Sequence, residues 1–347
     1  MTPEAFPTAA SAGFRMPAEW GPHERCWMAW PCRSEFWGEN LPATKKTYAA
    51  VANAIAEFEP VTMLAPPGDT ENCRQRCGGK VTVLPVELDD SWMRDNGPNF
   101  VLDNAGNLGA SIFHFNAWGK KHEPWGKDAA VGHRIAEYLD VRTFSSTIYM
   151  EGGGINVDGE GTVLVTEQNV LNENRNPGLG KDEASQILGD ALGVDTVVWC
   201  PGDPDDTETD GHIDGIACFV EPGRVLVEIC PAEGTERYDN MQANLDAIRN
   251  ATDSAGRKLR VEIIEEAYEA DRRSNIFASS YINYYIANGA IVMPSFGIDR
   301  DGDARNTLSA LYPDREIVQV DISDIAIGGG GIHCITQQQP VSKLSDP

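Results

Sequence analysis

Basic residues are scarce in this sequence. Its 347 residues include 28 Lys and Arg against 53 Asp and Glu, which gives a formal net charge of −25. Binding to nucleic acid depends on basic side chains that neutralise phosphates, so this balance argues against a nucleic-acid partner. It favours a positively charged small molecule as the ligand. The alternative explanation is an acidic surface that only keeps the protein in solution.

Long apolar runs and targeting signals are also lacking. No apolar run approaches the length of a membrane span. The first residues of the chain contain neither the basic nor the apolar segment of a signal peptide. We therefore expect a cytoplasmic protein that has no membrane partner.

The eight cysteines form neither a C-x-x-C pair nor a dense framework, which is typical of free thiols in a reducing compartment. Cys73 and Cys77 have no histidine or cysteine partners at the spacing of a zinc site. We expect neither a metal nor a cofactor.

One unit of structure recurs five times along the chain. Helical periodicity marks five segments, and a short β-rich run follows each of them directly. The helices are predicted at 43–59, 128–139, 182–192, 238–250 and 303–311, and the strands at 61–65, 141–144, 194–199, 259–264 and 316–320. Four units continue into a hairpin, with turns at 103–106, 158–161, 221–223 and 287–289.

The fifth unit has no hairpin of its own, because the chain ends soon after Pro340. The run 25–30 has strand character and no helix before it, so we expect it to complete the fifth unit and close a ring. The sequence thus predicts an α/β protein: a five-bladed α/β propeller with its active site in the central channel. No linker divides the chain, and we expect residues 1–347 to form a single catalytic domain.

Polar residues recur in phase with these units. Glu151 follows Asp95 by 56 residues, His212 follows Glu151 by 61, and Cys334 follows His212 by 122, which is twice 61. Equivalent positions in a closed ring converge on its axis, so these residues and Asp214 are expected to face one cavity. Taken singly, each has an ordinary explanation: a turn residue, a solvated loop charge, a structural histidine or a buried small cysteine.

A cysteine, a histidine and several carboxylates together favour one kind of chemistry. A thiolate supported by a histidine attacks an electrophilic carbon, and carboxylates hold a planar guanidinium through paired hydrogen bonds. We expect Cys334 to attack a guanidinium carbon held between Asp95 and Asp214. His212 would protonate the departing nitrogen and then activate water to hydrolyse the covalent thiouronium intermediate.

Several motifs together resemble the agmatine deiminase family of guanidino-group modifying enzymes. They span residues 16–340: Met16–Trp20, Trp27–Pro31, Asp89–Asp95, Phe115–Gly119, Glu151–Gly154, Leu171–Pro177, Gly211–Asp214, Tyr285–Gly289 and Gly328–Pro340. The resemblance implies the five-bladed propeller and hydrolysis of agmatine to N-carbamoylputrescine and ammonia, in putrescine biosynthesis from arginine. It also implies a homo-oligomer, which we expect to be a dimer.

The same resemblance implies roles for individual residues. Cys334 would be the nucleophile and His212 the acid and base, and the guanidinium ligands would be Asp95, Glu151 and Asp214. Trp92 and Glu208 would be further pocket residues, with Glu208 a candidate for the distal ammonium. Gly331 departs from the pattern, since many relatives have Asn there, and this puts the geometry of the loop in question.

Three alternatives remain at this point. A bacterial peptidylarginine deiminase shares much of the pattern, and an amidinotransferase uses the same Cys, His and carboxylate chemistry. A non-enzymatic propeller, such as the ribosome-binding initiation factor with this ring architecture, would lack the catalytic set.

Overall fold

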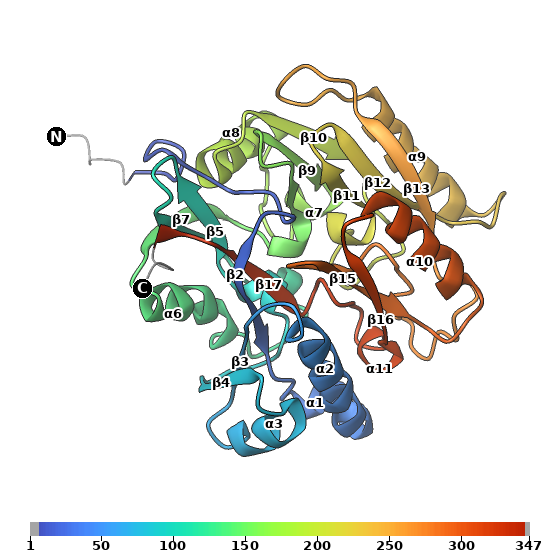
Figure 1. Cartoon of the computed structure of the whole chain (residues 1–347). Helices are drawn as coiled ribbons and strands as arrows, with labels where there is room; N and C mark the ends of the chain where they lie inside the picture. The colour runs from blue at the N-terminus through green and yellow to red at the C-terminus, as the bar shows by residue number, and fades with distance from the viewer. Residues whose placement is uncertain (1–6, 344–347) are drawn as a thin grey trace.

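The computed structural model of the chain describes residues 7–343 (Figure 1). Within this range the strands form five sheets, and each sheet is built around an antiparallel pair. The five pairs are β5 (Asn99–Asp103) with β6 (Leu108–His114), β8 (Asn156–Val157) with β9 (Thr162–Thr166), β11 (Ala217–Glu221) with β12 (Arg224–Ile229), β14 (Tyr285–Ala287) with β15 (Ala290–Ser295), and β17 (Thr336–Pro340) with β2 (His23–Ala29).

Each pair is extended by a parallel strand that follows a helix. The helices are α6 (Val131–Tyr138), α8 (Lys181–Leu192), α9 (Glu236–Asn250), α10 (Arg300–Leu311) and α2 (Leu41–Ile55). They lead to β7 (Arg142–Tyr149), β10 (Thr196–Cys200), β13 (Arg260–Glu265), β16 (Glu316–Asp321) and β3 (Val61–Ala65), respectively. These are the five helices and five strands that the sequence predicts, with ends that differ by a few residues. The four hairpin turns are confirmed as well, and the chain is an α/β protein.

The first long helix shows why these elements form. Apolar residues recur in α2 at helical spacing, so Tyr48, Val51 and Ile55 are fully buried. Pro42 lies in the first turn, where its missing N–H would have no partner within the helix. The buried face packs against β15 and β16, and full burial of each such side chain contributes about 1.5–3 kcal/mol.

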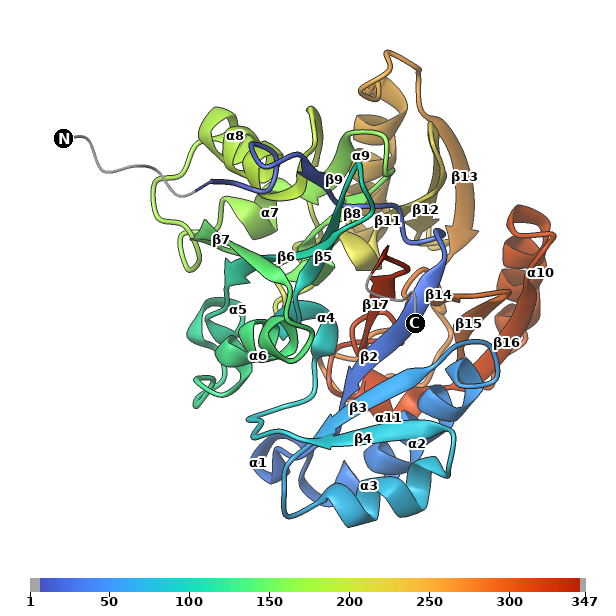
Figure 2. The ribbon, with the colours of Figure 1, turned by 60° about the vertical axis from the view of Figure 1, so that its left-hand side comes forward.

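Strand β2, from the N-terminal part of the chain, pairs with β17, the last strand that the structure describes. In the antiparallel pair of β2 and β17, Cys26 lies opposite Gln338 and Trp27 opposite Gln337. The Nε1 of Trp27 also donates a hydrogen bond of 2.9 Å to Gln339. Figure 2 shows the two strands side by side although they come from opposite ends of the chain. The prediction that the run 25–30 completes the fifth unit is confirmed by this pairing.

Some elements do not appear among the predictions. Helix α3 (Thr70–Cys77) leads to β4 (Val81–Pro85), which extends the fifth sheet, and β1 (Phe14–Arg15) extends the first. The helical pattern of α3 is weak, because only Cys73 and Cys77 are buried in a polar segment. Short helices in the connections are α1 (Ser34–Trp37), α5 (Ala117–Lys120), α7 (Glu167–Val170) and α11 (Ser323–Ala326), with the 3-10 turn η1 (Gly38–Asn40). The 3-10 turn η2 (Asp128–Ala130) forms the start of the helix predicted at 128–139.

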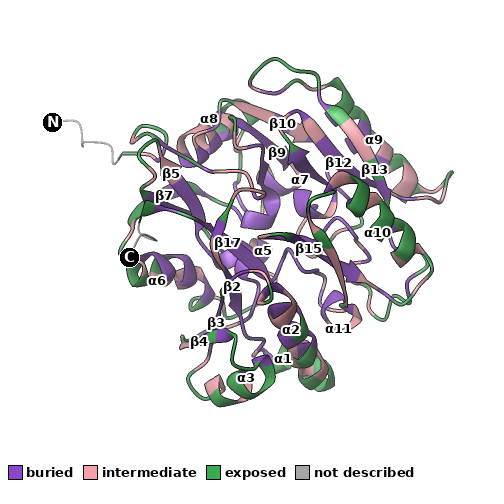
Figure 3. Ribbon diagram, viewed as in Figure 1, coloured by how far each residue is buried: buried purple, intermediate pink, exposed green. Residues whose placement is uncertain are grey.

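Burial follows the expected layering. The strands of the five antiparallel pairs are largely buried, whereas the parallel strands β7, β13 and β16 and the outer faces of the peripheral helices are more exposed (Figure 3). Within residues 7–343, no helix is both long and apolar enough to span a membrane. The interior therefore lies between the sheets and the surrounding helices, and the connections at the inner ends of the strands carry the site.

Candidate functional site

Five connections, one from each unit, meet at a common site. Each leads into the first strand of an antiparallel pair. They carry Asp95 in the short helix α4 (Met93–Asn96), Glu151 before the turn η3 (Gly152–Gly154), His212 and Asp214 at the turn η4 (Ile213–Gly215), Asn283 before β14, and Cys334 before β17. The sequence predicts the convergence of all of these except Asn283, and the contacts below confirm that they lie together.

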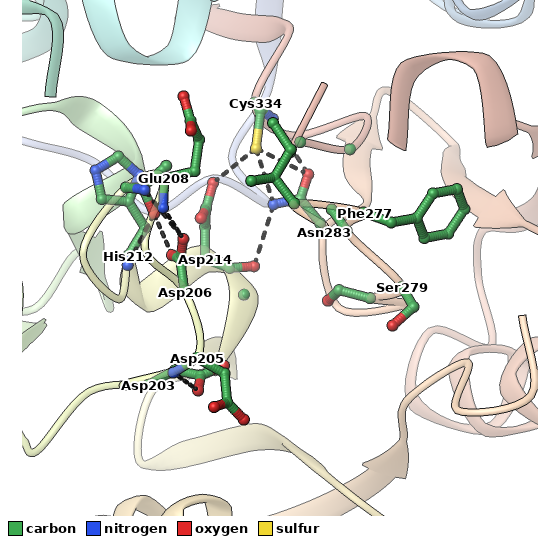
Figure 4. Close-up of a pocket in the computed structure, with 18 of the residues that line it drawn as sticks. Asp203, Asp205, Asp206, Glu208, His212, Asp214, Phe277, Ser279, Asn283 and Cys334 are labelled. Carbon is green, nitrogen blue, oxygen red and sulfur yellow. Dashed lines mark hydrogen bonds between the residues drawn. The ribbon is translucent and has the colours of Figure 1, made fainter. Parts of the chain in front are cut away.

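Cys334 is buried among polar groups, with 7% of its surface exposed. The Nδ2 of Asn283 donates to its Sγ at 3.2 Å, and its own backbone N–H donates to Oδ1 of Asn283 at 3.2 Å. The Sγ lies 3.6 Å from Oδ2 of Asp214 (Figure 4). Burial and the carboxylates of Asp214 and Asp95 raise the pKa of the thiol well above its ordinary value. The thiol is therefore protonated while the site is empty, and a cation bound beside it would favour the thiolate.

His212 lies between two carboxylates. Its Nε2 lies 3.1 Å from Oε2 of Glu151, and its Nδ1 lies 3.8 Å from Oδ1 of Asp95. Burial lowers the pKa of the imidazole, but Asp95, Glu151 and Asp214 raise it to about 9. Within residues 7–343, Nδ1 has no hydrogen-bond partner. At neutral pH the ring is thus an imidazolium, and within the described residues its Nδ1–H is not used in another hydrogen bond.

Asp95 is held by groups from two other motifs. Its Oδ2 accepts a hydrogen bond from Nε1 of Trp118 at 2.9 Å, and its Oδ1 accepts one from the backbone N–H of Gly153 at 3.0 Å. A Cβ at position 153 would lie 2.5 Å from Nδ1 of His212, so only glycine allows this close approach. Burial raises the pKa of Asp95 to about 6, although His212 opposes this effect.

Glu151 is engaged by other side chains of the protein. It is fully buried, and Arg175 donates to its Oε1 at 3.0 Å while Asn169 and His212 contact its Oε2 at 3.1 Å. Burial raises the pKa of Glu151, but the charges of Arg175 and His212 lower it to about 2. Its carboxylate is occupied by these partners, and it does not line the cavity beside Cys334. This geometry fits a residue that orients His212 better than a ligand of the guanidinium.

Asp214 is also buried, with its Oδ2 2.9 Å from Nδ1 of His333. Burial raises the pKa of this carboxyl, but His333 and His212 hold it below the ordinary value. Asp214 is therefore ionised beside the thiol of Cys334 at neutral pH.

A cavity of about 220 Å³ extends from Cys334, His212 and Asp214 toward the surface. Its lining is rich in carboxylates, and Figure 4 shows those that precede His212 in the chain: Asp203, Asp205, Asp206 and Glu208. Such a lining favours a cationic ligand over an anionic one. It also agrees with the acidic balance of the sequence.

The remaining predicted pocket residues lie close by. Trp92 stacks on Trp37 with ring centroids 5.8 Å apart, and with Glu208, Asp95 and Cys334 it lines a narrow cavity beside the thiol. The carboxylate of Glu208 contacts Nε2 of His122. Gly331 lines the larger cavity. All of the predicted site residues except Glu151 thus line one of the two cavities.

Sequence reasoning missed several residues that support the site. Trp118, Arg175 and His333 lie within motifs that the sequence reveals, but only the structure shows that they contact Asp95, Glu151 and Asp214. For Arg175, a signal was present: it is a lone basic residue in the polar stretch Leu171–Pro177. Asn283 offered only its position in the fourth unit.

No candidate metal centre emerges from the described part of the chain. In residues 7–343, no cluster of three or more His, Cys, Asp and Glu side chains is arranged to hold a metal ion. The functional groups that the geometry does supply are a thiol, an imidazolium and ionisable carboxylates.

A buried thiol lies beside a carboxylate in an acidic cavity that an imidazolium also lines. In an α/β fold, this set of groups defines an enzyme that acts on a cationic group. The chain belongs to the Porphyromonas-type peptidyl-arginine deiminase family, whose model matches residues 15–340. This is a family of hydrolases that act on C–N bonds of amidines.

Individual relatives are similar over nearly their full length. The chain is 40% identical over 361 residues to the agmatine deiminase of Pseudomonas aeruginosa strain UCBPP-PA14, covering 97% of this chain and 98% of that protein. It is 39% identical over 358 residues to the agmatine deiminase of Stutzerimonas stutzeri strain A1501, covering 96% and 97%. The solved structure of the agmatine deiminase of Enterococcus faecalis superposes with a TM-score of 0.93 at 33% identity, covering 97% of this chain and 98% of that one.

Proposed function

We propose that the chain is an agmatine deiminase, which hydrolyses agmatine to N-carbamoylputrescine and ammonia. The observation that carries the proposal is the position of the Cys334 thiol beside Asp214 and Asn283, at the end of a cavity lined by carboxylates. The names of the relatives support the choice of substrate. Agmatine carries a guanidinium at one end and an ammonium at the other, so both ends match an acidic cavity.

Binding comes first in the proposed mechanism. Asp95 and Asp214 accept hydrogen bonds from the planar guanidinium and hold its carbon against Sγ of Cys334. Glu208 and the acidic lining receive the distal ammonium, and Trp92 and Gly331 line the space between. The bound cation lowers the pKa of Cys334, which loses its proton as the substrate binds.

The chemical steps follow from the same groups. The Cys334 thiolate forms a bond to the guanidinium carbon, and the imidazolium of His212 gives a proton to the nitrogen that leaves as ammonia. Water then attacks the thiouronium carbon, His212 takes a proton from that water, and the C–S bond breaks to release N-carbamoylputrescine and the thiol. Glu151 orients His212 and stabilises its charge throughout.

The architecture carries a proposal of its own. We infer that the five sheets are blades of a propeller and that the channel between them holds the site. The repeated plan of the sheets supports this inference, as does the pairing of β2 with β17.

We also propose that the enzyme acts in the cytoplasm as a homodimer, on a route from arginine to putrescine. Sedimentation equilibrium measures the oligomeric state.

The competing function is deimination of a peptidyl arginine, which the description of the family favours. Ammonia release from agmatine, free arginine and a peptide with a C-terminal arginine separates the two functions. We expect kcat/KM to be highest for agmatine. Free arginine carries an additional carboxylate beside its ammonium, and the C-terminal arginine of a peptide has an amide in place of the ammonium and a carboxylate as well. Either change would be unfavourable against Asp205, Asp206 and Glu208. A preference for the peptide would contradict the assignment of substrate.

A second competing function is that of an amidinotransferase, which transfers the amidino group to an amine. The reaction with agmatine tests this function as well. Detection of the ureido product in the absence of an acceptor amine excludes an amidinotransferase. A protein that binds guanidino compounds without releasing ammonia would contradict the enzymatic proposal itself.

A further inference from the structure

His333 lies directly behind the carboxylate that faces the nucleophile. Its Nδ1 lies 2.9 Å from Oδ2 of Asp214, while its Nε2 lies 3.0 Å from Oε1 and 3.2 Å from Oε2 of Glu19. Glu19 comes from the segment before β2, more than 300 residues away in the sequence. All three side chains are buried, with exposed fractions of 4% for His333, 7% for Glu19 and 5% for Asp214.

The hydrogen bonds define the charge of His333. An ionised carboxylate only accepts hydrogen bonds, so both ring nitrogens must donate, and both can donate only in the imidazolium form. Burial raises the pKa of Glu19, but His333 and Arg94 lower it to about 2. Burial and Arg94 lower the pKa of His333, but Glu19 and Asp214 raise it above its ordinary value. At neutral pH, Glu19 and Asp214 are therefore anionic, and His333, which lies between them, is cationic.

Other groups around Glu19, His333 and Asp214 hold Glu19 in place. Nη1 of Arg94 lies 3.5 Å from Oε1 of Glu19, and Nε of Arg94 donates to the backbone oxygen of His333 at 3.3 Å. Nε2 of His23 lies 2.8 Å from the backbone oxygen of Glu19. Cys218 lines a small cavity beside Glu19, His333 and Asp214. The burial of these charges costs free energy that only a complete set of partners offsets.

We propose that Glu19 and His333 are positioning residues for Asp214. Neither side chain lines the cavity beside Cys334. The imidazolium of His333 fixes Oδ2 of Asp214 near the thiol and keeps that carboxylate ionised, and Glu19 keeps the imidazolium protonated. This inference rests on the proposed role of Asp214 as a guanidinium ligand. It also gives a function to the motif Met16–Trp20, which lies far from Cys334 in the sequence.

The first arm of the test measures kcat and KM for agmatine as functions of pH in Glu19→Gln and His333→Asn. Without the imidazolium, the effect of burial is less opposed, so the pKa of the Asp214 carboxyl rises and this group binds a proton at a higher pH than in the wild type. We expect the acid side of the pH profile of kcat/KM to become steeper, with a slope that corresponds to two protons instead of one. We also expect KM near neutral pH to rise about tenfold. The change in kcat should be smaller. The matched control is Glu24→Gln, in the adjoining strand β2 and partly exposed, which should leave both parameters and the slope unchanged.

The second arm requires neither a substrate nor a stable variant. Ring ¹⁵N chemical shifts of His333 in the full-length wild-type chain, assigned through its backbone, report whether both nitrogens carry protons. We expect the imidazolium form from pH 6 to beyond the pH at which an ordinary histidine is neutral.

The outcomes separate the inference from the proposed function. A neutral His333 at pH 7, or folded variants with the wild-type KM and a one-proton acid limb, would overturn the positioning role. Failure of the wild type to act on any guanidino compound would overturn the proposed function, whereas the ¹⁵N measurement would still decide the charge of His333.

Discussion

The carboxamide of Asn283 contacts Cys334 through both of its polar atoms. Its Nδ2 donates to Sγ at 3.2 Å, and its Oδ1 accepts from the backbone N–H at 3.2 Å and lies 3.4 Å from Sγ. The same Nδ2 lies 3.3 Å from the backbone oxygen of Asp214. One side chain thus fixes the nucleophile relative to the connection that carries His212 and Asp214. A donor at this distance stabilises a thiolate more than it stabilises a thiol.

Replacing Asn283 by Ala removes this donor and leaves the backbone N–H of Cys334 without its partner. We expect kcat/KM for agmatine to fall by about 10- to 100-fold, because a hydrogen bond to a charged group contributes about 1.5–3 kcal/mol. Steady-state kinetics and the rate of Cys334 alkylation check this prediction. Asn250→Ala, at an exposed position at the end of α9, serves as the control. Unchanged kinetics in the Asn283 variant would show that the contact has no catalytic effect.

The position of Asn283 leaves room only for a glycine at position 331. A Cβ at position 331 would lie 2.5 Å from Oδ1 and 2.9 Å from Cγ of Asn283. We expect Gly331→Ala to displace Asn283 and to lower kcat/KM to nearly the level of Asn283→Ala. In the double variant, the second substitution should add little, since both act on one contact. Fully additive losses would mean that Gly331 acts separately, for instance through direct contact with the substrate.

The pKa shifts predict a bell-shaped pH dependence of kcat/KM. Asp95, with its pKa raised to about 6, must lose its proton to hold a guanidinium, so activity should rise as the pH rises through about 6. His212, with its pKa raised to about 9, must keep its proton to release ammonia, so activity should fall as the pH rises through about 9. Nδ1 of His212 lies only 3.8 Å from Oδ1 of Asp95, so the two groups influence each other's protonation. The apparent pKa values read from the two sides of the pH profile therefore belong to the pair and not to either residue alone. A maximum below pH 6 would contradict these roles.

Glu151→Gln should move the alkaline limb to lower pH. The carboxylate is one of the groups that raise the pKa of His212, and its neutral isostere keeps the shape but not the charge. We also expect kcat to fall by about 100-fold, within the range typical of acid–base catalysis. Thermal unfolding of the variant reports the separate cost of removing one of the two carboxylates that pair with Arg175, which keeps Asp210. A large increase in KM with an unmoved alkaline limb would instead favour direct contact between Glu151 and the substrate.

Much of the fold follows from local patterns in the sequence. The five long helices have apolar faces at helical spacing, and the hairpins have recognisable turns, so both are visible without tertiary information. Helix α3 is not visible in this way, because its polar sequence buries only Cys73 and Cys77. The spacing of Asp95, Glu151, His212 and Cys334 along the repeats was enough to predict that these residues lie together.

The parts that could not be predicted depend on contacts between distant segments. Asn283 carries no charge and belongs to the least distinctive unit, and its importance lies in a contact with a residue 51 positions away. The sequence did not show that Arg175 and His212 contact the carboxylate of Glu151, so the orienting role proposed for this residue could come only from the structure. The charge of His333 similarly depends on Glu19, from the other end of the chain.

The central claim is that Cys334 forms a covalent bond with the guanidinium carbon of agmatine. Acid-quenched turnover followed by peptide mass spectrometry tests it most directly, with Cys32→Ser as the control for a partly exposed thiol outside the site. We predict an adduct with the mass of agmatine less ammonia on the peptide that contains Cys334, and no turnover by Cys334→Ser. An adduct on another residue, or turnover that survives in Cys334→Ser, would contradict the account.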